Sequence, residues 1–537
     1  MVGLFPKERD MIFQNNLRTI FGGGYNTGNA INYIRKLTML SILNLTKTNK
    51  LVLAAFAFVA VLAFGSGRAH AATLNVTGGC TLPIAINSVN AAANQSGCTA
   101  TGASYGTSDT ITIPAGTVTL AADLPLLTES VEIHGAGMSQ TTINGNAWKV
   151  FETGMASGSV TVTDLKVTAS KATAIQLVNC DVVLENIEVD GTGQTGNANG
   201  IIIFSSNSAS LDVSAENIYI HSLTGTNGQY AEGFSVGSRA GGHYDVNINN
   251  ITLANVHNTL AGVNGIILSA GYPGNGGGTI TSVISNATIH DITSSLIVAP
   301  FATFAAATNG DSTATTNINN ITVTGVRGFA GSGITAGLNT AAFYAAGLAG
   351  GPSDEANVSI TVSNSLMADN LNNGVSSNCS YGDMSGNVGG VGTVNSIITS
   401  AGYNISDDAS CAGFNQPGDQ QNVNNIISTL GPLQNNGGAV PTRALLPGSP
   451  AISAGGSVLG ITTDARGVAR PDECPSVGAY QYEGAVCGAS TPSASGGSNA
   501  GAPNTGVGSV AQILNVLASM LGIGLLTYVF HKQQRSS

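Results

Sequence analysis

The sequence predicts an all-β fold rich in turns, and its composition and residue pattern both point to it. Only 9% of the 537 residues are charged, whereas 42% are hydrophobic, a balance that excludes intrinsic disorder. The 71 glycines follow no Gly-X-Y period, so they favour frequent turns over collagen. Sustained helical periodicity is missing, and short segments rich in Val, Ile and Thr alternate with period two instead.

The first 71 residues are interpreted as an N-terminal extension and an export signal. Two lysines precede the apolar run 51–64, which is short for a membrane span. Ala69 and Ala71 fit the small-x-small pattern that signal peptidase cleaves. The mature chain is therefore expected to start at Ala72.

Repeats organise the middle of the chain. Seven segments share a polar lead residue, usually Asn, before a short alternating strand, at intervals in the range of about 20–50 residues that marks solenoids and propellers. A propeller blade would carry its own four-strand signature, which is missing. About three strands per repeat predict a right-handed parallel β-helix over 151–402, preceded by a cap and the first coils over 72–150. The lead residues are Asp164, Asn186, Asn217, Asn250, Asn286, Asn320 and Asn364.

A structural ladder is the expected role of these asparagines. Stacked at the same turn of successive repeats, their amides can hydrogen-bond one above the next and satisfy buried backbone groups. This interpretation is favoured over a binding role for Asn186, Asn217, Asn250, Asn286, Asn320 and Asn364.

Both ends of the predicted solenoid carry cap-like segments. Residues 80–93 predict a short amphipathic helix, and the motif CTLPIAI at 80–86 resembles the CSLREA-type N-terminal cap of bacterial surface β-helix proteins, with Pro83-Ile84 in place of Arg-Glu. Residues 403–483 contain LGPLQNNGG, LPGSPAI and DARGVARP, and they resemble the choice-of-anchor Q domain. The resemblance implies a pectin-lyase-like solenoid exposed at a cell surface, and it implies no activity.

The C-terminus resembles a sortase sorting signal. A Ser/Gly/Pro-rich linker is expected over 484–502, and the segment 503–537 combines an LPxTG-like motif, an apolar stretch expected to be a transmembrane helix, and a basic tail. A plain membrane anchor is the alternative. These signals predict a secreted protein that is held at the cell surface by the wall or the membrane. Signal peptidase and a sortase-like enzyme are the expected processing partners. The motif residues are Pro503, Asn504, Thr505 and Gly506, after Ala502 where the pattern has Leu.

Cysteine usage fits an oxidising exterior. Proximity suggests three disulfides, although six cysteines allow 15 connectivities. Cys180 lies in an apolar segment and is expected to be a buried small hydrophobe. The suggested pairs are Cys80–Cys98, Cys379–Cys411 and Cys474–Cys487.

Charge excludes nucleic acid as a partner. The formal net charge is −11, and the acidic excess is larger over 72–505 because most Lys and Arg lie outside that stretch. Phosphate backbones need clustered basic residues. Metal-ligand spacing is missing as well, so no cofactor is expected; calcium stays open because the chain is acidic, although no calcium motif is present.

Catalysis is the less favoured hypothesis. Glycoside hydrolysis needs two carboxylates across a cleft, and Asp407 and Asp408 are the weak candidates, with a turn role preferred. The histidines look scattered, and no Lys or Arg sits in an acidic cluster of recognisable spacing. We therefore expect a non-catalytic, adhesin-like protein that contacts glycans, wall polymers or another cell surface. The alternatives are a polysaccharide lyase or glycoside hydrolase acting on acidic polysaccharide, and a purely structural surface-layer component.

Overall fold

The computed structural model describes residues 71–484 except 227, 239–240, 272–275 and 331–338. Strands dominate it, accompanied by one α-helix, α4 (Leu82–Asn90), and two 3₁₀-helices, η3 (Ser385–Val388) and η4 (Ile426–Thr429). The predicted all-β class is therefore confirmed. Ala69, Cys487, the linker 485–502, the motif Pro503–Gly506 and the apolar stretch after it lie outside the described residues.

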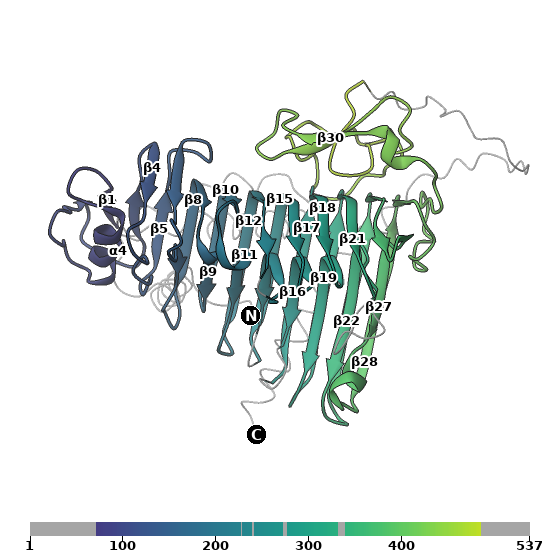
Figure 1. Ribbon diagram of the computed structural model, residues 1–537, viewed down its shortest axis with the longest axis horizontal. Coiled ribbons are helices and arrows are strands. Elements are labelled where there is room, and N and C mark those ends of the chain that lie inside the picture. The colour runs from purple at the N-terminus through teal and green to yellow at the C-terminus, as the bar shows by residue number, and fades with distance from the viewer. Residues whose placement is uncertain (1–70, 227, 239–240, 272–275, 331–338, 485–537) are drawn as a thin grey trace, which may run out of the picture. The chain divides into compact units, whose positions relative to one another are not determined.

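Nearly all strands belong to two sheets (Figure 1). The smaller sheet has eight strands: β7 (Phe151–Glu152), β9 (Lys171–Val178), β11 (Thr195–Phe204), β14 (Ala231–Gly237), β16 (Val263–Ala270), β19 (Val298–Ala307), β22 (Phe343–Ala349) and β27 (Cys379–Asp383). The larger sheet has 21 strands: β1 (Ala72–Asn75), β2 (Thr101–Gly102), β3 (Asp109–Thr112), β4 (Gly116–Thr119), β5 (Val131–His134), β6 (Thr141–Asn144), β8 (Ser159–Thr168), β10 (Asp181–Asp190), β12 (Ser210–His221), β13 (Thr224–Gly225), β15 (His243–Asn258), β17 (Gly278–Ser285), β18 (Thr288–Ser294), β20 (Ser312–Asn319), β21 (Thr322–Gly328), β23 (Glu355–Ser363), β24 (Leu366–Ala368), β25 (Leu371–Asn372), β26 (Val375–Ser376), β28 (Thr393–Gly402) and β29 (Ile405–Ser406).

Pairing within both sheets is parallel apart from β1–β2 and β25–β26, and the register is regular except for single shifts in β9–β11 and β23–β28. Each strand pairs with the equivalent strand of the next repeat, so like residues stack. In the larger sheet Leu165 pairs with Ile187, which pairs with Ile218. Alternate residues of each strand point inward, and they form one continuous apolar core between the sheets.

The lead residues of the repeats adopt a left-handed backbone conformation. Asp164 has φ 61°, and the six lead asparagines lie between 48° and 61°. Among non-glycine residues, Asn and Asp tolerate this region best. Each lead residue therefore turns the chain between the long strand segment before it and a short segment after it, and the short segments present a second outward face.

The expected asparagine ladder forms over only part of the stack. The Nδ2 atom of Asn186 donates to Asp164 Oδ1 (2.8 Å), Asn217 Nδ2 donates to Asn186 Oδ1 (2.9 Å), and Asn250 Nδ2 donates to Asn217 Oδ1. From Asn286 onward the pattern changes. Asn286 Nδ2 donates to Asn249 Oδ1 and to the Thr463 carbonyl. The Asn364 side-chain amide bonds Gly456, and no described residue hydrogen-bonds the side-chain amide of Asn320. The prediction of a continuous ladder through all six is thus wrong, and C-terminal residues bond the side-chain amides of Asn286 and Asn364 in its place.

Helix α4 closes the N-terminal end of the core (Figure 1). Pro83 stands in its first turn, where a missing N–H costs nothing, and no side chain caps it. Leu82, Ala85 and Ile86 are buried in the core. The sequence-predicted cap helix at 80–93 is therefore present, and shorter than expected.

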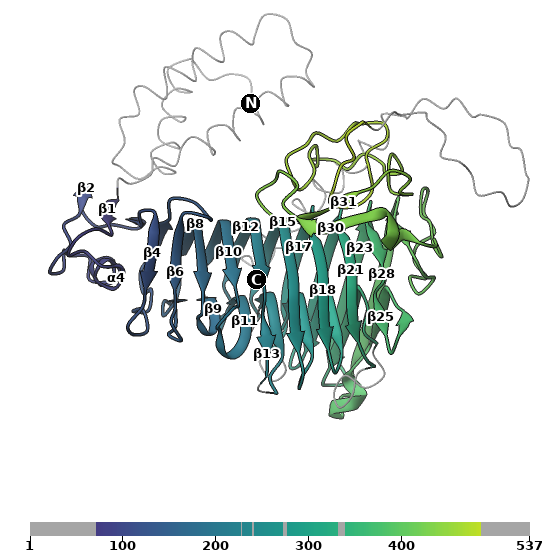
Figure 2. The same ribbon diagram turned by 45° about the horizontal axis from the view of Figure 1, so that its top comes forward.

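The C-terminal region 403–483 lies against the last repeats of the larger sheet (Figures 1 and 2). It includes the antiparallel pair β30 (Leu430–Gln434) and β31 (Thr442–Leu445) and a small apolar core of its own around Ile426 and Leu445. It contacts the short segments that follow Asn250 and Asn320: Thr252 Oγ1 donates to the Pro441 carbonyl (2.7 Å), and Arg443 Nη1 donates to Thr324 Oγ1 (3.0 Å). Within the described part of the chain, no helix has the length and apolarity required to cross a membrane.

Candidate functional site

Four ionisable side chains gather on the outward face of β8, β10 and β12, just before the C-terminal region begins to cover this face. The register pairs Lys166 with Glu188, and Asp190 with His221. Because the lead residue of each repeat turns the chain, positions two and four residues after it point outward in adjacent rows. We call Lys166, Glu188, Asp190 and His221 the charged cluster.

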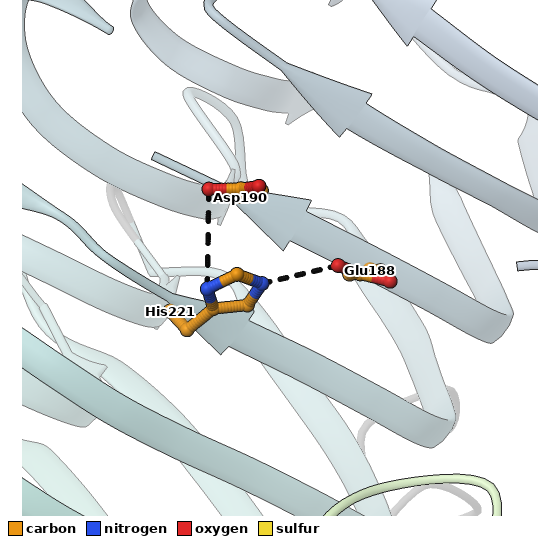
Figure 3. Close-up of side chains that lie close together, drawn as sticks. All are labelled: Glu188, Asp190 and His221. Atoms are coloured by element: carbon orange, nitrogen blue, oxygen red, sulfur yellow. Dashed lines mark hydrogen bonds and ion pairs between the residues drawn. The ribbon is translucent and has the colours of Figure 1, made fainter. Parts of the chain in front are cut away.

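Ion pairs and hydrogen bonds connect the charged cluster, and Figure 3 shows three of its members, Glu188, Asp190 and His221. Lys166 Nζ lies 2.8 Å from Glu188 Oε1 and 3.0 Å from Asp190 Oδ2. His221 Nε2 lies 3.1 Å from Glu188 Oε1, and His221 Nδ1 contacts Ser222 Oγ at 2.9 Å. The Tyr219 ring stacks on the His221 ring with centroids 4.3 Å apart.

These contacts shift the pKa values within the charged cluster. Burial opposes the ionised form of Glu188, but hydrogen bonds from His221 and Lys166 outweigh it and lower the pKa of Glu188. Burial also opposes ionisation of Asp190, and its bonds to Thr192 and Lys166 lower its pKa nonetheless. The same two carboxylates raise the pKa of Lys166 against the effect of burial. All three groups are therefore charged at neutral pH.

A cleft of about 380 Å³ lies beside the charged cluster, between the larger sheet and the loop that joins β30 to β31. One wall carries Glu188 and Tyr219 together with Asp164 and Asn186 of the ladder. The opposite wall is the loop, which contributes Val440 and other residues. The lining residues used below are Met138, Asp164, Asn186, Glu188 and Tyr219 on the sheet side, and Asn435 and 438–441 on the loop side.

The charged cluster could in principle hold a metal ion, since one ligand atom from each of Glu188, Asp190 and His221 lies within 4.8 Å of the others. The ammonium of Lys166 already bonds both carboxylates. It supplies the positive charge that a cation would bring, so the residues present do not fit a metal site.

The charged cluster is a correction to the sequence prediction. The sequence places Lys166 outside any recognisable acidic cluster and His221 among scattered histidines, yet stacking of the repeats brings both against Glu188. The sequence does contain a signal for this cluster. When the repeats are aligned on Asp164, Asn186 and Asn217, Lys166 and Glu188 lie two positions after the lead residue, and Asp190 and His221 lie four positions after it.

Asp407 and Asp408, the weak catalytic candidates, lie in the turn after β29, away from the cleft. Asp407 accepts hydrogen bonds from the Asp369 amide (2.7 Å) and Asn378 Nδ2 (2.8 Å). Asp408 accepts from the Asn378 amide and from the hydroxyls of its neighbours Ser406 and Ser410. Burial raises the pKa of Asp407, but both carboxylates are occupied in fixing the turn, as the preferred sequence interpretation has it.

Two of the expected disulfides are present in the described residues, Cys80–Cys98 and Cys379–Cys411. Cys474 is also disulfide-bonded, and its expected partner Cys487 lies outside the described residues. Cys180 is a buried free cysteine, and burial raises the pKa of its thiol to about 12. It is thus a small core residue rather than a reactive one.

Two arginines of the C-terminal region have different kinds of partner. Arg466 forms a salt bridge with Asp464 (2.9 Å). Arg470 donates to the Ser476 and Gly478 carbonyls and to Asn286 Oδ1.

No family model matches the sequence, and no curated protein matches it significantly.

Proposed function

We propose that this chain is a right-handed parallel β-helix displayed at a cell surface, and that it binds glycans non-catalytically through the cleft. Support for the winding comes from the two in-register parallel sheets, whose strands alternate along the chain from β7 to β28. Parallel strands cannot be joined by hairpins, so each repeat has to pass from one sheet to the other before it returns.

The observation that carries the binding proposal is the composition of the cleft walls. Tyr219 offers a half-buried aromatic ring, and Asp164 and Glu188 offer carboxylate acceptors on the same wall. Ala439 and Pro441 supply apolar surface opposite. Sugars present apolar ring faces edged with hydroxyl donors, and a cleft that combines apolar surface with a few placed polar groups suits such a ligand.

The charge states in the charged cluster argue against catalysis. A general acid in glycoside hydrolysis needs a raised pKa, whereas Glu188 and Asp190 both have lowered pKa values. A lysine base for a lyase needs a lowered pKa, whereas the pKa of Lys166 is raised. Glu188 and Asp190 are therefore unsuited to act as the general acid, and Lys166 is unsuited to act as the base.

Surface display rests on the resemblances and on chemistry. The CSLREA-like cap, the choice-of-anchor Q-like region 403–483 and the LPxTG-like motif all belong to exported surface proteins. Disulfides such as Cys80–Cys98 and Cys379–Cys411 persist in oxidising compartments. We therefore propose secretion, with retention at the wall or membrane through the C-terminus by a sortase-like enzyme.

A glycan screen tests the proposal. We expect the purified chain to bind a subset of immobilised glycans, and Tyr219→Ala to reduce that binding at least tenfold. Tyr381→Ala is the matched control, because Tyr381 is an exposed tyrosine on β27 of the other sheet.

Two outcomes would contradict the proposal. A fall in the viscosity of a pectin or alginate solution would favour a polysaccharide lyase or hydrolase instead. Binding to no glycan would favour a purely structural component of the surface layer.

A further inference from the structure

We infer that the cleft selects neutral or amino-substituted sugar units and rejects uronic acids and other anionic sugars. This inference rests on the proposed glycan-binding function and names its ligand class. Two observations support it: acidic side chains face the cleft, and the nearest basic side chain, Lys166, already forms two ion pairs.

Acidic groups dominate the sheet-side wall. Asp164 and Glu188 line the cleft directly, and Asp190 is linked to Glu188 through Lys166. Lys166 supplies the one ammonium in the charged cluster, and the carboxylates of Asp164, Glu188 and Asp190 outnumber it. The wall keeps a net negative charge, which disfavours an anionic ligand.

Lys166 is not available to offset a ligand carboxylate. Its Nζ atom bonds Glu188 Oε1 at 2.8 Å and Asp190 Oδ2 at 3.0 Å. A uronic acid would have to draw the ammonium away from two acids that are already half-buried. Removing one partner from such an arrangement leaves uncompensated charge, so breaking the ion pairs of Lys166 with Glu188 and Asp190 would offset the new ion pair with the sugar.

Neutral sugars and amino sugars, by contrast, can donate hydrogen bonds to the acidic wall. Lys166 and His221 both bond Oε1 of Glu188, and Oε2 takes part in neither contact. A hydroxyl or ammonium on the ligand can donate to this oxygen, and charge-assisted bonds of this kind are the strong ones. The Tyr219 ring, stacked on His221, can support the apolar face of the pyranose.

Asp164 allows the charge argument to be tested without disturbing the fold. It is the single acid in a stack whose next six lead positions are asparagines with the same left-handed φ. An asparagine at this position keeps the backbone conformation, and its Oδ1 atom can still accept the hydrogen bond from Asn186 Nδ2. Asp164→Asn therefore removes one negative charge from the cleft and, beyond that, changes only the hydrogen bond that Oδ2 accepts from Thr163 Oγ1 (2.9 Å).

The experiment measures binding of length-matched oligomers of glucose, glucosamine and galacturonic acid to the full chain by calorimetry at low salt. We expect the glucose or glucosamine oligomer to bind and the galacturonate oligomer to bind at least tenfold more weakly. Asp164→Asn should narrow that ratio about threefold, the size of one charge interaction across a solvated cleft. Asp212→Asn is the control, since Asp212 is an exposed acid on β12 outside the cleft.

The possible outcomes distinguish failure of this inference from failure of the proposed glycan-binding function. Tightest binding of the galacturonate oligomer, or an unchanged ratio in Asp164→Asn with unaltered thermal unfolding, would overturn the inference and leave glycan binding standing. Failure of all three oligomers, together with a negative glycan screen, would overturn the proposed function itself.

Discussion

Arg470 donates a hydrogen bond from Nη2 to Oδ1 of Asn286 at 3.1 Å, across a sequence separation of 184 residues. The same guanidinium donates to the carbonyls of Thr463, Ser476 and Gly478. One buried side chain therefore organises the C-terminal region and fastens it to the asparagine stack of the larger sheet. Burial lowers the pKa of Arg470 to about 10, which leaves it charged at neutral pH.

Arg470→Lys should loosen the C-terminal region. Lysine keeps the charge but cannot reach several acceptors in a planar fork, so we expect a loss of about 2–4 kcal/mol in the free energy of unfolding and faster proteolysis within 430–480. Arg327→Lys is the control, because its pair with Asp369 is more than a third exposed. Equal protease resistance of Arg470→Lys and the wild type would show that the region is held by other contacts.

Substitutions at Asn217 should reveal the left-handed backbone. Asn217 has φ 57°, so Asn217→Ala loses the ladder bonds and also strains the backbone, whereas Asn217→Gly loses only the bonds. Alanine should be the more destabilising by about 1 kcal/mol in urea unfolding. At Asn247, an exposed position on β15, the order should reverse because glycine weakens ordinary strands. The same order at both sites would refute the conformational argument.

Lys166→Met should destabilise the protein most near neutral pH. The lowered pKa values of Glu188 and Asp190 contribute stability above their ordinary values of 4.5 and 3.8, and this contribution is lost as pH falls through the lowered values. The raised pKa of Lys166 contributes stability below its ordinary value of 10.5, and this contribution is lost as pH rises through the raised value. The deficit should be about 1–3 kcal/mol at pH 7 and should shrink toward pH 3.

Lys149→Met provides the comparison for this pH series. Its pair with Glu152 is also an ion pair on the surface of the repeats, but the lysine is 43% exposed. We expect its deficit to be small at every pH. A Lys166→Met deficit that does not change with pH would mean that lost packing, not charge, accounts for the effect.

The thiol of Cys180 should be inert in the folded protein. Burial raises its pKa to about 12, and the thiolate is the reactive form. Iodoacetamide at pH 8 should label the Cys180 peptide only after denaturation, as followed by mass spectrometry. Rapid labelling of the native protein would show that this part of the core opens readily.

Much of the local structure follows from the sequence because it depends on neighbouring residues. Period-two alternation predicts short strands such as Asn217–Ile220, which lies within the observed strand β12, and the recurring lead Asn predicts turns at equivalent places. The backbone conformation of Asn217 is also local, since few non-glycine residues adopt a positive φ as readily. These features can be predicted without knowing which residues pack against them.

The cleft depends on contacts between distant residues, which a single sequence does not reveal. Glu188 and His221 are 33 positions apart, and they meet only when the repeats stack in the observed register. The other wall requires Pro441 to lie beside Thr252, 189 positions earlier. The later asparagines fail to extend the ladder for the same reason: Asn286 contacts Thr463, and the sequence pattern holds no information on that docking.

Oxidative footprinting with and without a saturating bound glycan tests most directly where the ligand sits. Met138 and Tyr219 line the cleft and are partly exposed, so hydroxyl radicals should modify both in the free protein, and ligand should protect both at least threefold. Tyr381 on the other sheet should react equally in both states. Protection of Tyr381 with none at Met138 and Tyr219 would place the glycan elsewhere and contradict the account.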